Sequence, residues 1–165
     1  MTYLIIVEGI TDKGVVQKIT EKLNVKAEIL LMRGNRPSKA SHLVNAKLVV
    51  KNYSKVMVLK DQHEHPEDKI LEKLTEITRN VQHPKTYPIM VKKAIEAWIL
   101  AGMGVPNPEN IDNPEEHLDH ILQLQGKRYV KTLKTAKKLA ENINPQQASQ
   151  HSNTLKQFIK ALKDP

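Results

Sequence analysis

The chain has 165 residues and a net charge of +8; 39% of its residues are hydrophobic and 4% are aromatic. It has no cysteine, which excludes disulfides and thiolate metal sites, and its first apolar run is too short for a signal peptide or a membrane span. We therefore expect a soluble, cytoplasmic protein whose core consists of Ile, Leu and Val.

Four short apolar runs predict β-strands, and helical patterns separate them. The predicted strands cover 3–7, 28–32, 55–59 and 86–90. The predicted helices cover 11–23, 38–52, 66–81 and 91–101. In the second helix, the residues expected to face the core are Leu43, Ala46, Val49 and Val50. This alternation predicts an α/β fold with a central parallel sheet of about four strands and helices on both faces.

After Gly102 the pattern changes to proline-rich loops and helices. The further predicted helices cover 115–124, 130–142 and 153–162. We therefore divide the chain into an α/β domain, residues 1–101, and a helical C-terminal extension, residues 102–165, packed on it. From residue 124 to the end there are nine Lys or Arg and two Asp or Glu, a balance of +7, whereas residues 1–123 have a balance of only +1. Such a surface suits a polyanion such as nucleic acid, although lysine-rich helices also occur simply because they are soluble.

Two of the predicted strands end in a carboxylate, Glu8 after the first and Asp61 after the third. Side chains at the carboxyl ends of parallel strands converge on one crevice, so these two acids are expected to share a divalent cation. Gly9 permits close approach of the backbone, which favours a site. The plainer interpretation is that Glu8 is a turn acid and that Asp61 caps a helix or lies in a loop.

Three segments carry a resemblance to a known family: VEGITDKGVVQKI, KVMVLKDQHEH and IEAWILA. Over residues 3–101 the chain resembles the topoisomerase–primase (Toprim) domain, and in particular small stand-alone Toprim proteins related to the overcoming-lysogenization-defect nucleases. The resemblance implies a Toprim/Rossmann-like domain that binds Mg²⁺ and performs phosphoryl transfer on nucleic acid. It assigns proton transfer to Glu8, metal binding to Asp61 and His63, and a third acidic position to Glu96.

His63 departs from the family pattern, which has a second aspartate at this position. Mg²⁺ prefers oxygen ligands, whereas histidine suits Mn²⁺ or Zn²⁺ better. Glu64 or Asp68 could supply the missing oxygen, the metal could be Mn²⁺, or catalysis could be lost. His63 and His65 are two residues apart and point oppositely in an extended chain, which disfavours a dedicated zinc site and leaves His65 exposed.

Several further residues are candidates for the functional site, and each also has an ordinary structural explanation. Glu96 lies in an apolar helix and belongs either to the site or to an ordinary helix surface, and Trp98 fits the core better than a base-stacking platform. The cations expected to flank the strand ends and to hold phosphates are Lys13, Arg33, Arg36 and Lys60. One basic helical face is predicted from the spacing of Lys127, Lys131, Lys134 and Lys138. For all of these cations the alternative is a scattered, solvated charge.

The leading functional hypothesis is a nuclease dependent on Mg²⁺ or Mn²⁺, with Glu8, Asp61 and Glu96 as catalytic residues. One alternative is a Toprim module that binds nucleic acid without cutting it, which His63 favours. Another is a receiver-like signalling domain phosphorylated on Asp61, although Glu8 lacks the adjacent acid that such domains carry. The expected partner is DNA or RNA and not a membrane, while a homodimer and a partner ATPase remain open.

Overall fold

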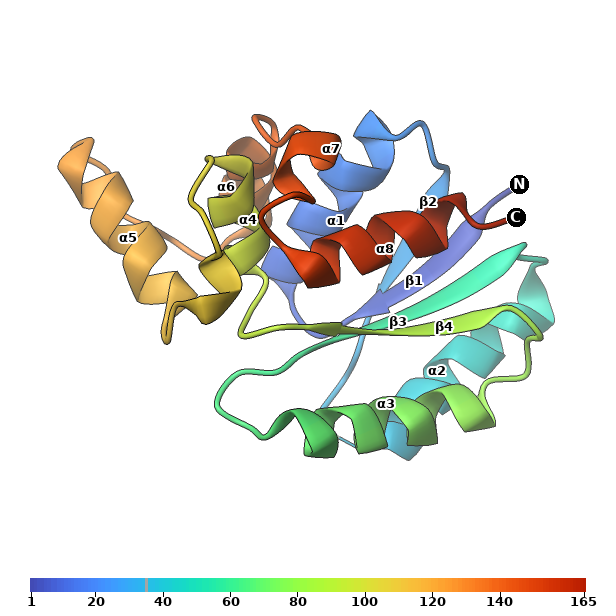
Figure 1. The fold of residues 1–165 in the computed structure, drawn as a ribbon. Helices are drawn as coiled ribbons and strands as arrows, with labels where there is room; N and C mark the ends of the chain where they lie inside the picture. Colours follow the sequence, from blue (N-terminus) through green and yellow to red (C-terminus); the bar gives the residue numbers. More distant parts are fainter. Residues whose placement is uncertain (35) are drawn as a thin grey trace.

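The computed structural model describes residues 1–34 and 36–165, and a single parallel sheet forms its centre (Figure 1). The four strands are β1 (Tyr3–Val7), β2 (Ala27–Leu31), β3 (Lys55–Asp61) and β4 (Thr86–Val91). They pair in the order β2-β1-β3-β4, with Tyr3 opposite Ala27 on one side and opposite Lys55 on the other. The predicted α/β fold with a four-stranded parallel sheet is confirmed.

The helices between the strands cover both faces of this sheet. They are α1 (Ile10–Lys22), α2 (Pro37–Val50) and α3 (Glu67–Asn80). The chain moves outward from β1 to β2 and then returns to the other side of β1, so successive right-handed crossovers put α1 on one face and α2 and α3 on the other (Figure 1). The direction of winding reverses between β1 and β3, and ligands of open α/β sheets bind at the carboxyl ends of strands at such a switch point.

Alternation along the strands divides the apolar core into two layers. On β1, Ile5 and Val7 join the layer under α1, whereas Leu4 and Ile6 join the layer under α2 and α3. On β3 the same alternation continues through the buried run Val56–Leu59. Asp61 is two residues beyond Leu59, so the alternation assigns it to the α1 side of the sheet.

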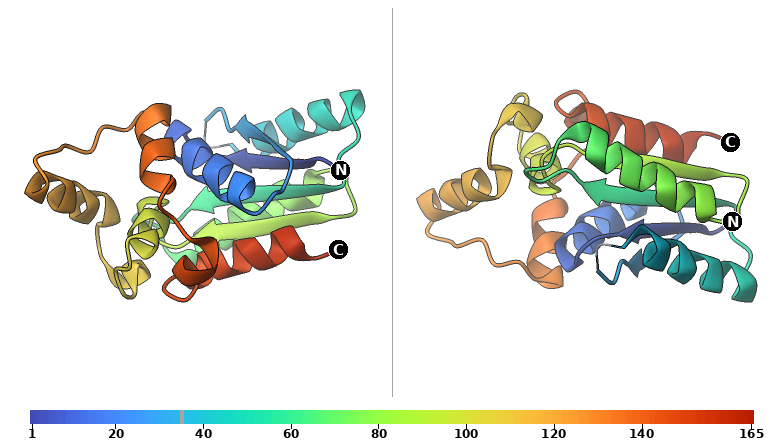
Figure 2. Two further views of the ribbon diagram at one scale, coloured as in Figure 1. Left: turned by 90° about the horizontal axis from the view of Figure 1, so that it is seen from above. Right: turned by 90° about the horizontal axis from the view of Figure 1, so that it is seen from below.

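After β4 the chain forms helices joined by loops, and most of these helices lie on the α1 side of the sheet. They are α4 (Glu96–Gly102), the 3-10 helix η1 (Pro108–Asn110), α5 (Pro114–Leu124), α6 (Leu133–Ala140), α7 (Pro145–Ala148) and α8 (Asn153–Lys163). Figure 2 shows that α8 runs along the sheet beside β4, whereas α5 stands away from it. Apolar residues of the C-terminal extension and of the sheet form one continuous buried cluster. No helix in the described ranges is both long and apolar enough to cross a bilayer.

Buried polar groups hold α8 at both ends. At its C-terminal end, the ammonium of Lys55, which is only 2% exposed, donates to the carbonyl of Ala161 at 2.6 Å. At its N-terminal end, the carboxylate of Glu109 accepts from the backbone N–H of Asn153 at 2.8 Å. These two contacts satisfy backbone groups that a helix leaves unpaired at its termini.

The structure corrects two helix boundaries and one helix face. Helix α4 begins at Glu96 and not at residue 91, because Val91 completes β4 and a turn follows it. The helix predicted over 130–142 begins only at Leu133. The face of α2 was predicted wrongly: Val49 and Val50 are each 84% exposed and Ala46 is exposed as well. The buried residues of α2 are Ala40, Ser41 and Val44. Trp98, in contrast, is fully buried, as expected for a core residue.

Candidate metal centre

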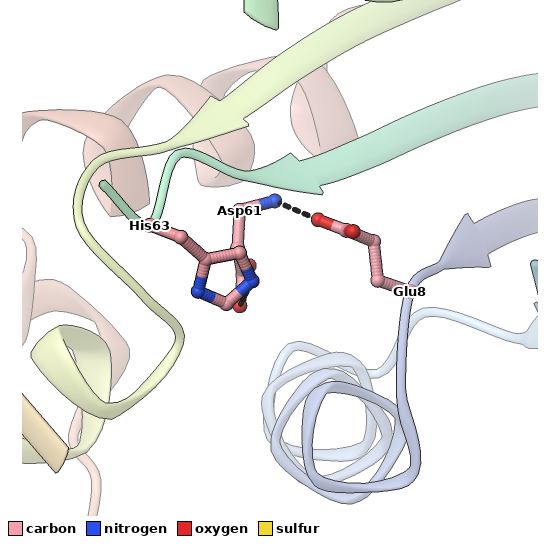
Figure 3. A group of neighbouring side chains, drawn as sticks. All are labelled: Glu8, Asp61 and His63. Carbon is pink, nitrogen blue, oxygen red and sulfur yellow. Dashed lines mark hydrogen bonds and ion pairs between the residues drawn. The ribbon is translucent and has the colours of Figure 1, made fainter. Parts of the chain in front are cut away.

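Glu8 and Asp61 lie side by side at the switch point, one after β1 and the other at the end of β3 (Figure 3). The backbone N–H of Asp61 donates to Glu8 Oε1 at 2.5 Å. Asp61 is buried at 6% exposure, whereas the Glu8 side chain is 20% exposed. The two acids therefore meet as their strand positions predicted, and Glu8 is the one that solvent reaches more easily.

His63 completes a group of three side chains that could hold a metal ion. One ligand atom each from Glu8, Asp61 and His63 lies within 4.8 Å of the others, and His63 Nε2 is 3.9 Å from Asp61 Oδ2 (Figure 3). The backbone of His63 has a φ of +52°, which is unusual for a residue other than glycine. Its N–H donates to the carbonyl of Lys93 at 2.6 Å, so the loop after β3 is fastened to the loop after β4. This contact holds the ring near the acids despite the uncommon backbone conformation.

Asp12 is a third acid of the cluster. It lies in the first turn of α1, where its Oδ2 accepts from the N–H of Gly9 at 2.9 Å. The pKa of Asp12 is raised to about 7, mainly by burial, and the nearby carboxylates of Glu8 and Glu96 raise it further. Hydrogen bonds with Gly9 and Asp61 lower this pKa but do not offset the rise. In the sequence Asp12 gave only a helix-start signal. Its position one turn after Glu8 was the cue that would have placed it in the site.

Asp61 shares this environment. Burial raises its pKa well above the ordinary range, and the charges of Asp12, Glu8 and Glu96 raise it further. Asp61 Oδ2 accepts from the backbone N–H of Ile95 at 3.3 Å, which orients the carboxyl group toward the turn before α4. The cluster therefore contains two buried carboxyl groups that favour a bound proton or a cation over two free negative charges.

Glu96 is the fourth acid, and it is only 2% exposed. The interpretation as a surface glutamate is therefore wrong. Tyr129 Oη donates to Glu96 Oε2 at 2.7 Å, and the backbone N–H of Tyr129 donates to Asp119 at 2.9 Å. Burial raises the pKa of Tyr129, and the Glu96 charge raises it further, so the phenol stays a neutral donor. The sequence gave no cue to Tyr129, because it is far from the acids along the chain.

Lys60 lies inside the cluster and not on the surface around it. Its ammonium is 3.2 Å from Glu8 Oε2, and the residue is 5% exposed. The prediction that Lys60 holds phosphates of a bound strand therefore needs correction, because a side chain so enclosed is occupied by Glu8. Its contact neutralises part of the negative charge and orients the Glu8 carboxylate.

The loop after β3 extends from the cluster without adding a carboxylate to it. Glu64 and His65 are exposed, and with His63, Lys93 and Asp112 they border an open cavity of about 400 Å³. The exposure of His65 was expected. Glu64 is not among the three residues whose ligand atoms converge, and Asp68 is exposed on α3. Neither carboxylate therefore takes the place of the acid that the family pattern has at position 63.

The predicted basic residues are dispersed. Arg33 and Arg36 are exposed on either side of residue 35, which lies outside the described residues, and Lys13 is half-buried on α1. The single basic helical face is wrong, because Lys127 and Lys131 precede α6 in a non-helical segment. Lys131 is 2.8 Å from Glu115. All four cations of that set, Lys127, Lys131, Lys134 and Lys138, are exposed.

Comparison of the chain with protein-family models, with curated proteins and with solved structures finds no match.

Proposed function

We propose that this protein cleaves phosphodiester bonds of nucleic acid with the help of a divalent cation held by Glu8 and Asp61. The observation that carries the proposal is the meeting of these two acids at the switch point of the sheet, where the charges of Asp12 and Glu96 also act on Asp61. The resemblance of the sequence to Toprim domains agrees with it.

The donor set fits a divalent cation. The charges of Glu8 and Glu96 act on the two buried carboxyl groups of Asp12 and Asp61, and the ion pair between Lys60 and Glu8 offsets only part of this negative charge. Mg²⁺ is commonly held by one or two carboxylates with water completing its shell, and the His63 nitrogen also admits Mn²⁺. A bound cation would supply charge neutralisation at the phosphate and a more acidic water.

The residues of the chain have distinct parts in this proposal. Glu8 is the most accessible of the four clustered acids, Glu8, Asp12, Asp61 and Glu96, so it exchanges a proton with water or with the leaving oxygen. Lys60 holds one Glu8 oxygen and the Asp61 N–H holds the other, which fixes the carboxylate in one orientation. The hydroxyl of Tyr129 donates to one oxygen of Glu96 and so orients that carboxylate.

A cleavage assay tests the proposal. Labelled single- and double-stranded DNA and RNA are incubated with Mg²⁺, with Mn²⁺ or with EDTA. We expect cleavage that needs the metal, and we expect Glu8→Gln and Asp61→Asn each to reduce its rate at least about 100-fold, because each change removes a charged group from the reacting centre.

Asp68→Asn is the matched control, because Asp68 is an exposed acid close to the same loop, and its rate should equal that of the wild type. Cleavage that persists in both site variants would refute the assignment.

A second candidate function is binding of nucleic acid without cleavage. Two observations favour it: His63 stands where an oxygen ligand is expected, and Lys60 already occupies one oxygen of Glu8. Two results together would identify this function: nucleic acid binds without any metal, and it is not cleaved with either Mg²⁺ or Mn²⁺.

A further inference from the structure

A second cavity lies in the C-terminal extension. None of the four residues of the acid cluster, Glu8, Asp12, Asp61 and Glu96, lines it. Its volume is about 380 Å³, and it is bounded by the end of α4, the end of α5, α6 and the segments that follow α5 and α6. It is lined by Gly102, Met103, Leu122, Gln125, Lys127, Arg128, Thr135, Lys138, Leu139 and Asn142.

The lining combines apolar walls with a cationic rim. Leu122 is buried and Leu139 half-buried, and their side chains form an apolar surface with Met103. Three cations, Lys127, Arg128 and Lys138, belong to the lining, and all three are exposed. No carboxylate is among the ten lining residues. The cavity is therefore suited to a ligand that has both an apolar part and a negative charge.

The backbone that carries two of these cations is fixed at its start. Gly126 has a φ of +73°, the left-handed conformation that ends α5. The N–H of Lys127 donates to the carbonyl of Leu122 at 2.8 Å, and the N–H of Gly126 donates to that of Gln123 at 3.0 Å. This pattern is a Schellman motif, which sets the direction in which the chain leaves the helix. Lys127 and Arg128 are therefore held at the cavity by the helix end itself.

The same segment connects the cavity to the acid cluster. Tyr129 directly follows Arg128, and its hydroxyl donates to Glu96. Glu96 begins α4 and Gly102, which lines the cavity, ends it. At 1.5 Å per residue, these two positions are about 9 Å apart along the helix axis. A ligand in the cavity would thus lie within about one short helix length of the acids.

We propose that this cavity binds one nucleotide unit, with the base between the apolar walls and its phosphate at Lys127, Arg128 and Lys138. Nucleobases have flat apolar faces and polar edges, and the side-chain amides of Gln125 and Asn142 can hydrogen-bond such edges. An aliphatic anion would match the walls and the cations and leave these amides unused. The unit is either a free nucleotide or one nucleotide of a bound strand. Only the second case, in which the strand is cut at the acids, rests on the proposed function.

Binding measured in EDTA tests this site apart from cleavage. The ligands are AMP and dTMP, followed by calorimetry, and a fluorescent single-stranded octanucleotide, followed by anisotropy. Binding of the mononucleotides indicates a free nucleotide as the source, and binding of the octanucleotide alone indicates a unit of a strand. We expect Leu139→Trp, which fills the cavity, and Lys127→Ala/Lys138→Ala, which removes two rim charges, each to weaken binding about tenfold or more.

The controls separate this inference from the proposed function. Lys39→Ala/Lys69→Ala removes two exposed lysines from α2 and α3, the same charge as the double change at the cavity, and should bind as the wild type does. A wild-type protein that cleaves nucleic acid but binds equally well after the cavity changes would overturn the cavity alone. The cavity would also be overturned if neither the mononucleotides nor the octanucleotide bound, or if decanoate bound and neither of them did.

Discussion

At the scale of single residues, the balance of charge around Asp61 decides what the cluster can hold. Lys60 pairs with Glu8, and Tyr129 contributes a neutral hydrogen bond to Glu96. Asp12 and Asp61 are buried, and they share a hydrogen bond with each other. Without a cation, one of these two groups must keep a proton, because two adjacent buried negative charges are costly.

This proton makes folding stability depend on pH. The pKa of Asp12 is 3.8 in an ordinary environment and about 7 in the folded protein. Between these values the folded state holds a proton that the unfolded state has lost, so the Asp12 contribution to stability falls as pH rises from about 4 to about 7. The raised pKa of Asp61 likewise makes stability fall as pH rises. The pKa of Glu28 is lowered, mainly by its hydrogen bond with Tyr53, so the Glu28 contribution to stability rises with pH instead. We expect the Tm in EDTA to fall from pH 5 to pH 8, and to fall less in Asp12→Asn.

The comparison variant is Asp112→Asn, because Asp112 is fully exposed. Its Tm should follow that of the wild type across the same range of pH. If Asp12→Asn loses as much stability between pH 5 and pH 8 as the wild type does, Asp12 does not hold the proton.

At the scale of helices and strands, the close contact of α1 with α6 positions the segment that carries Tyr129. Gly14 lies in the middle of α1, and a Cβ at this position would be 2.6 Å from Ala136 Cβ and 3.1 Å from the Leu133 carbonyl oxygen. The absence of a side chain therefore sets how near α6 can approach. Leu133 begins α6 four residues after Tyr129, so a shift of α6 would also move the phenol away from Glu96.

We predict that Gly14→Ala destabilises the fold, although alanine is the better helix former by about 1 kcal/mol. The expected net loss in the free energy of unfolding is about 1–3 kcal/mol, because the added methyl group overfills the contact. Urea unfolding measures it. The partner variant Ala136→Gly removes the methyl group that is in the way, so Gly14→Ala/Ala136→Gly should be more stable than the sum of the two single changes predicts. Strict additivity would mean that this contact does not limit the packing of the helices.

The sequence predicts best those helices and strands whose type follows from the pattern of apolar residues within the segment itself. The apolar run Lys55–Leu59 was predicted as a strand and lies inside β3, because it is buried on both faces of the sheet and no helical pattern competes with it. The beginning of α4 was predicted too early because the apolar residues of β4 and of α4 follow one another with only a short turn between them. In α2 the valines near its end suggested an inward face, but its fully buried residues, Ala40, Ser41 and Val44, lie in its first eight residues.

The site could be predicted only in part for a similar reason. Glu8 and Asp61 end apolar runs, and strand-end positions in a parallel sheet determine where they meet. Asp12 was missed because an acid in the first turn of a helix has an ordinary explanation, namely that it caps the backbone N–H groups there. Tyr129 joins the site only through the path of the chain after Gly126, and this path depends on tertiary packing.

At the scale of the whole molecule, positive charge is concentrated in the part of the chain that surrounds the cavity and covers the α1 side of the sheet. Residues 124–165 carry a balance of +7 out of a total of +8. The lysines fall into two groups, one around α6 and one on α8. If nucleic acid reaches the acid cluster along the segment that carries Tyr129, the group around α6 lies on its path and the group on α8 lies elsewhere along the sheet (Figure 2).

The dependence of binding on salt separates these two surfaces. For single strands, the slope of log K against log salt concentration is about −0.7 for each phosphate neutralised. We therefore expect the triple variant Lys127→Ala/Lys134→Ala/Lys138→Ala to make the slope less negative by about 2. The variant Lys156→Ala/Lys160→Ala/Lys163→Ala removes the same charge from exposed positions of α8 and should leave the slope nearly unchanged. Anisotropy titrations of a labelled oligonucleotide in EDTA, at several salt concentrations, provide both slopes. A larger effect of the α8 variant would place the bound strand along α8, away from Tyr129 and the cavity, and equal effects would indicate a diffuse attraction to the net charge.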